Sequence, residues 1–285
     1  MRRGDMAAKL RRDGGWWALL LPAFLLLSVF YITPIVQVLA ISFTEPEPGL
    51  GNYQRIATNL SVQRVIWTTL RICAITTALA LMLGYGLAYA ITLASEQARR
   101  WWLLCVLVPL WISVLVRAFA WVTLLRRQGL INQTLQGAGI IAEPLELVWN
   151  EFGIIVGMVH YMVPYAVLPM LAAMREIEPR LLAAARGLGA SRGQVFRQVF
   201  FPLSAPGLVA AGVLVFIFSL GFYITPAILG GGRTLMVAEW ISLQILDLIR
   251  WGLGTMMATL LVVTILVTLA VFSRVVNMRR LFGGA

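Results

Sequence analysis

The chain has 285 residues, of which 60% are hydrophobic and 12% are charged, with a mean hydropathy of +0.86 and a formal net charge of +11. This apolar share is well above that of soluble domains, so a soluble globular protein is excluded and an integral membrane protein is predicted. The basic residues lie between apolar stretches, so the positive charge indicates membrane sidedness, and nucleic-acid binding is not expected.

The sequence contains few residues able to carry chemistry. Cys73 and Cys105 lie in apolar runs and the single histidine is His160, so neither a disulfide framework nor a metal site is predicted. There is no glycine-rich phosphate loop, metalloprotease helix or nucleophile elbow. An enzyme acting alone is therefore disfavoured, and no cofactor is expected to bind this chain.

Six apolar stretches are each long enough to cross a hydrocarbon core of about 30 Å. The first follows a basic tail at residues 1–15, and it is roughly twice as long as the core of a signal peptide, which is the alternative interpretation. The predicted spans are residues 16–41, 67–93, 101–125, 153–174, 207–229 and 252–272. The expected fold class is an all-α integral membrane protein with six transmembrane helices.

Small residues predict where the spans pack closely. In the second span, Gly86 and Ala90 form a pair that allows close helix approach, and Gly153 and Gly157 have the same spacing at the start of the fourth span. Between the last two spans, residues 235–251 are apolar but interrupted by one polar arc. This segment is predicted to be an amphipathic helix, at the surface or against the bundle, rather than a seventh span.

A basic loop at residues 175–206 separates the fourth and fifth spans, and it predicts a helix, a turn and a second helix. Gly189 is expected to end the first helix in a left-handed conformation. Ser191 can then cap the second helix, with Gln194 completing a capping box. Pro202 is expected to close that second helix because it has no amide to donate.

This loop resembles the EAA loop of permease subunits of binding-protein-dependent ABC importers: Glu-Ala-Ala, three residues, Gly, nine residues, then Ile-x-Leu-Pro. The matching positions are Ala184, Ala185, Gly189, Val199, Phe201 and Pro202. The family's glutamate falls on Ala183, so its polar contact is lost in this chain. The resemblance implies a type I importer fold in which the loop is a cytoplasmic coupling-helix hairpin. The residues expected to contact an ATPase subunit are Ala183, Ala184, Ala185, Arg186, Gly189, Ala190, Ser191, Phe196 and Pro202.

Further stretches resemble permeases of the spermidine/putrescine type, so that the resemblance covers about residues 16–275. These stretches are residues 113–121, 129–132, 151–160, 225–231 and 234–237. The resemblance implies import of a polyamine or a similar small solute. It also implies three kinds of partner: two ABC ATPase subunits that use ATP and magnesium, a second permease that is a different chain, and a periplasmic solute-binding protein.

Orientation follows from the distribution of Lys and Arg. If the N-terminus is cytoplasmic, the inner segments hold 15 of the 23 basic residues. The positive-inside rule then places residues 1–15, the basic loop 175–206 and the C-terminal tail 274–285 in the cytoplasm. The expected location is the bacterial inner membrane, crossed several times.

Five residues are candidates for a substrate path or gate. Arg117 lies deep in the third span, where an unpaired charge is costly, and Trp121 one turn later could stack on its guanidinium. Glu151 lies in an acidic outer loop, and Phe222 and Tyr223 lie near the outer end of the fifth span. Structural alternatives stay open for all of them: a link between helices, a solvated carboxylate and an interfacial aromatic belt.

Two other functions compete with the importer. A self-contained secondary transporter or channel would use Arg117 or His160 for ion coupling, although a histidine hydrogen-bonded across helices is the more expected role for His160. A membrane scaffold without transport activity is favoured only by Ala183 at the position of the family's glutamate.

Overall fold

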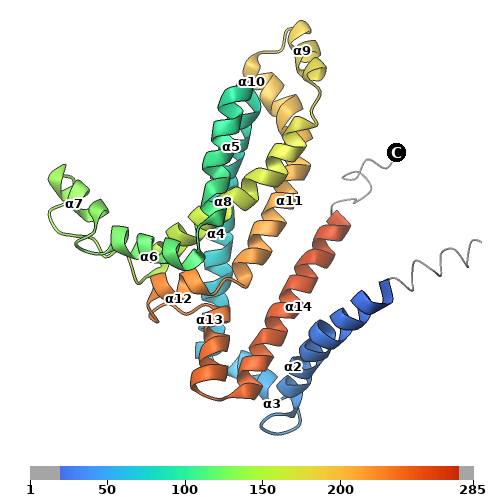
Figure 1. The fold of residues 1–285 in the computed structure, drawn as a ribbon, viewed down its shortest axis with the longest axis vertical. Coiled ribbons are helices and arrows are strands. Elements are labelled where there is room, and N and C mark those ends of the chain that lie inside the picture. The colour runs from blue at the N-terminus through green and yellow to red at the C-terminus, as the bar shows by residue number, and fades with distance from the viewer. Residues whose placement is uncertain (1–19, 276–285) are drawn as a thin grey trace, which may run out of the picture.

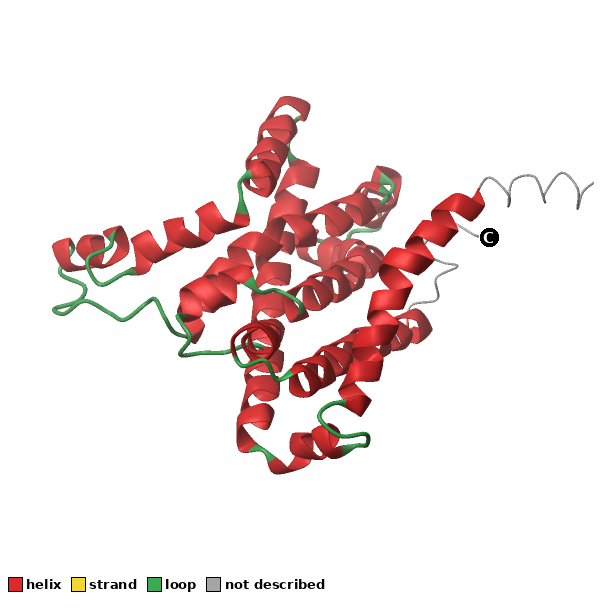
Figure 2. Ribbon diagram, turned by 60° about the horizontal axis from the view of Figure 1, so that its bottom comes forward, coloured by secondary structure: helices red, strands yellow, loops and turns green. Residues whose placement is uncertain are grey.

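A computed structural model describes residues 20–275, and every regular element in this part of the chain is helical (Figures 1 and 2). Five helices are long and apolar enough to cross a membrane: Leu20–Thr44, Leu60–Leu93, Glu151–Arg175, Arg192–Leu220 and Trp251–Arg274. A sixth results if the bent pair Glu96–Trp111 and Val114–Gly137 is one span. The predicted all-α membrane fold is therefore confirmed. The basic tail 1–15, the start of the first span and residues 276–285 lie outside the described residues.

After the helical turns that begin at Leu20, the chain continues as a series of helices joined by short connections. They are η1 (Ser28–Ile32), α2 (Thr33–Thr44), α3 (Gly51–Thr58), α4 (Leu60–Leu93), α5 (Glu96–Trp111), α6 (Val114–Leu125), α7 (Leu130–Gly137), α8 (Glu151–Arg175), α9 (Pro179–Gly187), α10 (Arg192–Val195), η2 (Phe196–Phe200), α11 (Phe201–Leu220), α12 (Ile224–Gly230), α13 (Val237–Ser242), η3 (Leu243–Asp247) and α14 (Trp251–Val275). The elements labelled η are π-helical turns, which are wider than α-helical ones.

Helix α8 is the centre of the bundle, because it packs against both α4 and α11. The shared interior is built from small and flexible side chains, among them Ala88, Met162, Ala166, Met170 and Ala211, all of which are fully buried. Helices α2 and α14 pair with each other and lie to one side of this group (Figure 1). The α4, α8 and α11 group is therefore the core of the described bundle.

The close approach of α4 and α8 depends on Gly84. A Cβ atom built on Gly84 would lie 2.8 Å from Cβ of Ala166, whereas one on Gly86 would have no atom within 4 Å. Gly86 and Ala90 are exposed, and Gly84 and Ala88 are buried. The predicted Gly86 and Ala90 contact is therefore wrong. Both pairs have the same four-residue spacing, and spacing alone does not say which face of a helix meets its neighbour.

The predicted third span, residues 101–125, is broken. Helix α5 ends at Trp111, the backbone at Ile112 and Ser113 is extended, and the chain axis bends by 99° before α6 begins. Pro109 lies inside the last turn of α5 and removes one hydrogen-bond donor there. Helices α6 and α7 consequently project to one side of the bundle (Figure 1), and a straight helix over this stretch is the wrong description.

The predicted fifth span, residues 207–229, is wrong at both ends. Elements α10, η2 and α11 form one helix of 29 residues, Arg192–Leu220, so Pro202 does not close a separate helix as predicted. The wider π-helical turn directly before Pro202 gives room to a ring that would clash with an ordinary preceding turn. The long helix ends at Gly221, and Phe222 and Tyr223 lie in the break before α12.

Elements α13 and η3 form the helix predicted within residues 235–251. Of the two placements that the sequence left open, the structure has the segment against the bundle, where α13 packs on α14 and α4 and buries Val237 and Trp240. The Val237 amide donates a hydrogen bond to Thr69 Oγ1 at 2.8 Å, which fixes the start of α13 to α4.

Replacing Gly84 by leucine is expected to destabilise the subunit, because the new side chain would overlap Ala166. Overpacking of this kind typically costs about 1–3 kcal/mol. Thermal unfolding of the subunit in detergent should show a lower midpoint for Gly84→Leu. The matched control is Gly86→Leu, which adds the same side chain to the same helix in open space and should leave the midpoint unchanged. Equal midpoints for the two variants would contradict this packing.

Candidate functional site

The basic loop forms a hairpin of α9 and α10 at one end of the molecule, far from α3 and α13 at the other end (Figure 1). Helix α9 has no buried residue, and Ala183, Ala184 and Arg186 are exposed on it. Gly189 has a φ of +88°, a conformation that side chains other than glycine's rarely adopt. The predicted left-handed turn at Gly189 is confirmed.

The capping box that begins the second helix is also confirmed. The Gln194 amide donates to Ser191 Oγ at 3.4 Å, and the Ser191 amide donates to Gln194 Oε1 at 2.8 Å. These bonds fix the direction in which the chain leaves the turn. Leu188 lies at the tip of the turn and is 90% exposed. The hairpin therefore presents an apolar tip on a well-defined backbone.

Five aromatic residues, here called the anchor cluster, attach the second helix of the hairpin to α4. Ring centroids lie 5.2 Å apart for Tyr89 and Phe196, 5.1 Å for Tyr89 and Phe200, and 5.8 Å for Tyr85 and Phe201. The Tyr85 hydroxyl also shares a hydrogen bond with the Ser204 hydroxyl at 2.8 Å. Phe196, which the sequence placed on the contact surface, is thus half-buried in the anchor cluster.

Arg117 on α6 reaches into the bundle and is only 7% exposed. Its guanidinium carbon lies 4.3 Å from the centre of the Tyr161 ring on α8. The predicted stack of Trp121 on Arg117 is wrong, because the Trp121 indole donates instead to His160 Nδ1 at 3.3 Å. The expectation that His160 hydrogen-bonds across helices is confirmed.

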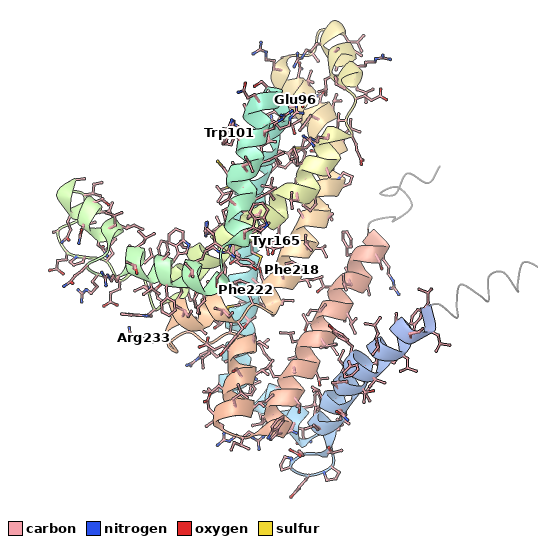
Figure 3. The ribbon with its side chains drawn as sticks, in the orientation of Figure 1. Glu96, Trp101, Tyr165, Phe218, Phe222 and Arg233 are labelled. Carbon is pink, nitrogen blue, oxygen red and sulfur yellow. The ribbon has the colours of Figure 1, made fainter. Side chains whose placement is uncertain are left out.

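Tyr161 belongs to a group of four aromatic residues, here called the central patch: Tyr161, Tyr165, Phe218 and Phe222. Ring centroids are 4.5 Å apart for Tyr161 and Phe222, 5.7 Å for Tyr161 and Tyr165, and 5.2 Å for Tyr165 and Phe218. Figure 3 shows Tyr165, Phe218 and Phe222 grouped where α8 meets the end of α11. Neither tyrosine was predicted from the sequence, although their spacing of four residues along an apolar span was a usable signal.

The break after α11 separates the two aromatic residues that the sequence had grouped. Phe222 belongs to the central patch, where it packs on Tyr161. Tyr223 is 44% exposed, and its hydroxyl accepts a hydrogen bond from Ser242 Oγ on α13 at 3.4 Å. The structure therefore brings Phe222 and Arg117 together around Tyr161 and leaves Tyr223 in a different contact.

A cavity of about 530 Å³, here called the outer cavity, lies where α4 and α8 begin, and Arg64, Arg71, Glu151 and Arg233 line it. Glu151 is the first residue of α8 and forms an ion pair with Arg71, so it is not the solvated loop carboxylate of the sequence-based alternative. Arg64 and Arg233 make no ion pair within residues 20–275. This cavity is therefore basic, and its one carboxylate is already neutralised.

Glu239 on α13 is a half-buried carboxylate outside the candidate spans. Burial raises its pKa from the ordinary 4.5 to about 7, against a smaller opposing effect of a hydrogen bond with the Met236 backbone. Its Oε2 atom is buried and has no hydrogen-bond partner in the described part of the chain. This side chain therefore keeps its proton to a higher pH than an ordinary glutamate does.

Comparison with known proteins gives one family. Residues 80–282 match the model of a protein family described as a binding-protein-dependent transport system inner membrane component. The chain is 30% identical over 254 residues to the spermidine/putrescine transport system permease protein PotB of Haemophilus influenzae, covering 86% of this chain and 88% of that protein. It is 28% identical over 251 residues to the PotB protein of Escherichia coli, covering 85% and 90% of the two chains.

Solved structures show the same fold. A chain of a bacterial alginate ABC transporter, in complex with an alginate pentasaccharide-bound periplasmic protein, matches with a TM-score of 0.78 and 20% identity over 96% of this chain and 97% of that one. A chain of the MetNI methionine ABC transporter, in an inward-facing conformation, matches with a TM-score of 0.57 and 19% identity over 78% and 97% of the two chains.

The raised pKa of Glu239 predicts a pH-dependent stability. The folded subunit holds this proton to a higher pH than the unfolded chain does, so unfolding releases a proton between pH 4.5 and about 7. Stability contributed by this group is therefore present at low pH and lost as the pH rises through that window. The thermal midpoint of the wild type should fall more between about pH 5 and pH 8 than that of Glu239→Gln. Parallel pH profiles for the two proteins would contradict the assignment.

Proposed function

Because this chain belongs to the family of binding-protein-dependent transport system inner membrane components, we propose that it forms half of the translocation path of an ATP-driven importer of polyamines. Members of this family are multi-pass permease subunits of the inner membrane, not enzymes. The proposal adds the solute, the partners and the orientation, with both termini and the α9–α10 hairpin in the cytoplasm.

The observation that carries this proposal is the exposed hairpin. Its turn is fixed by Gly189 and by the Ser191 capping box, its first helix buries nothing, and its tip exposes Leu188. A defined, unburied backbone at the end of two long helices suits a cleft in another protein. The protein that carries this cleft is proposed to be an ABC ATPase, present in two copies per transporter. ATP and magnesium would bind to the ATPase.

The hairpin is positioned to pass movement into the membrane. The helix Arg192–Leu220 runs without interruption from the capping box to Gly221, next to the central patch. The anchor cluster holds the start of this helix against α4. When the ATPases close, displacement of the hairpin would therefore tilt α11 about its contact with α4 and change the geometry around Phe222. Such a shift between two packed arrangements is the usual form of a transport transition.

Two observations support a polyamine as the solute. The PotB relatives are spermidine/putrescine permeases by name, and the central patch offers aromatic faces that attract ammonium groups. The alginate transporter solved with its periplasmic protein supports a periplasmic binding protein as a partner. A second permease, different from this chain, would complete the path.

The secondary transporter is the weaker candidate. It requires an ion-coupling residue in the membrane, yet His160 is hydrogen-bonded to Trp121 and Arg117 is packed on Tyr161. A membrane scaffold without transport activity does not require the ordered hairpin. The importer transports only with its ATPase partners. A secondary transporter would transport without them, and a scaffold would not transport.

Purification from the native membrane in mild detergent, followed by reconstitution into liposomes, tests the proposal. We expect an ATP-binding subunit and a second permease to co-purify, and spermidine-loaded binding protein to stimulate ATP hydrolysis. Uptake by this chain alone would overturn the importer in favour of the secondary transporter. ATP hydrolysis that responds to another solute but not to polyamines would overturn only the substrate.

Gly189→Val is expected to uncouple the transporter. A β-branched residue at a φ of +88° is strained by about 1–3 kcal/mol, so the hairpin turn should distort and the ATPase should bind less. The measurement is the amount of ATPase recovered with the subunit, together with stimulated ATP hydrolysis. Gly187→Ala is the control, because a Cβ atom there meets nothing within 4 Å and the residue lies in a helix. Equal recovery for both variants would remove the coupling role of the turn.

A further inference from the structure

Arg117 is incompletely compensated within its own chain. Its Nε and Nη1 atoms are buried without a hydrogen-bond partner among residues 20–275, and no ion pair there includes it. Within this part of the chain, the charge of the guanidinium faces the Tyr161 ring. A cation-π contact contributes about 0.5–2 kcal/mol, whereas burying an ion costs several kcal/mol. The ring alone therefore does not offset the burial of this guanidinium.

The described chain has no carboxylate that could reach Arg117 from within the membrane. In the candidate spans of residues 20–275, acidic residues occur only in the first turns of α5 and α8, as Glu96 and Glu151. Glu151 is engaged by Arg71, and Glu96 lies at the hairpin end of α5 (Figure 3). The candidate spans of this chain therefore offer Arg117 no carboxylate, and one from another molecule could reach it at Nη2, the guanidinium nitrogen that this chain does not enclose.

The surface around Arg117 is suited to a protein partner. On α6, Leu115, Val116 and Phe119 are 48%, 60% and 56% exposed, and Phe218 of the central patch is 44% exposed. Leu115 and Phe119 lie on the side of α6 opposite the buried Arg117, whereas Phe218 lies in the central patch beside Tyr165. An apolar helix of a second subunit that covers Phe218 would therefore lie next to the central patch, on which Arg117 packs. A membrane-embedded acidic side chain on that helix is costly unless it is paired, and Arg117 would pair with it.

A second copy of this chain does not meet the requirement. It would bring another Arg117, and the described spans contain no deep carboxylate to oppose it. Two unpaired guanidinium groups at one membrane interface repel each other and remain desolvated. The charge pattern therefore favours a partner of different sequence.

We infer that Arg117 binds a carboxylate carried by a transmembrane helix of a second, non-identical permease subunit, beside the central patch. The inference rests on the proposed function, which supplies the partner. An unpaired Arg117 near the path would repel a cationic polyamine. An arginine neutralised by a partner carboxylate does not repel a cationic solute.

Cysteine cross-linking in the assembled complex tests the contact. Arg117→Cys is combined in turn with a cysteine at each membrane-embedded Asp or Glu of the co-purifying permease, and bridging by a thiol-specific cross-linker about 10 Å long is scored on gels. A linker is needed because an arginine holds its partner's Cα atom beyond the roughly 7 Å limit of a direct disulfide. One pair is expected to cross-link. Cross-linking between two copies of the Arg117→Cys chain, or no cross-link with any acidic position, would overturn the inference. This readout needs assembly and not transport, so it stays interpretable if the polyamine proposal fails.

A charge exchange tests the chemistry. Arg117→Glu alone, and the partner's carboxylate changed to arginine alone, should each lower uptake at least tenfold, while the combination should restore at least half of wild-type uptake. Arg126→Glu, an exposed charge reversal at the end of α6, is the control and should leave uptake unchanged. Failure of the double variant to improve on the singles would overturn the pairing. Import of an anionic solute that Arg117→Gln abolishes would also overturn it, since the carboxylate would then belong to the solute.

Discussion

The close approach of three helices at α8 is the constraint on which the rest of the structure depends. Gly84 of α4 lies against Ala166, and a Cβ atom on Gly207 of α11 would lie 2.5 Å from Cβ of Ala173, about two turns further along α8. Helix α12 also approaches α8 at Gly157. Inside a bilayer, lipid tails are as apolar as leucine, so such tight contact, more than hydrophobic burial, holds helices together. The tyrosines of the central patch lie on the part of α8 that these contacts leave uncovered.

Polar chemistry is confined to a few places on this frame. The exposed arginines of the hairpin lie at one end and the basic outer cavity lies at the other, while the hydroxyl groups within spans mostly bond to their own helix, as Thr69 and Thr92 do. Arg117 is the exception, a deep charge on a helix that leaves the main direction of the bundle. The bend before α6 is what allows the side chain to enter the bundle from the side and meet Tyr161. The irregular backbone at residues 112–113 therefore serves to place the buried charge of Arg117 against an aromatic ring.

The sequence predicted the helical membrane fold, the left-handed Gly189 and the Ser191 capping box, because each depends on composition or on neighbours a few residues away. It did not predict the bend at residues 112–113, since hydropathy measures how apolar a stretch is and not the direction of its backbone. The continuity through Pro202 depends on a π-helical turn that the proline rule does not include. The Tyr161 partner of Arg117 follows from how α6 is oriented after its bend, so helix spacing pointed to Trp121 instead.

The uninterrupted helix from the hairpin to the central patch has a mechanical consequence. Its early residues are clamped to α4 by the anchor cluster, which makes that cluster a fulcrum with a short arm toward Arg192 and a long arm toward Leu220. The long arm, from Phe200 to Leu220, is about 30 Å at 1.5 Å per residue. A tilt of only about 10° would move its far end by about 5 Å, close to the rise of one helical turn. A small displacement of the hairpin arm would thereby become a larger displacement of the end of α11, beside the central patch.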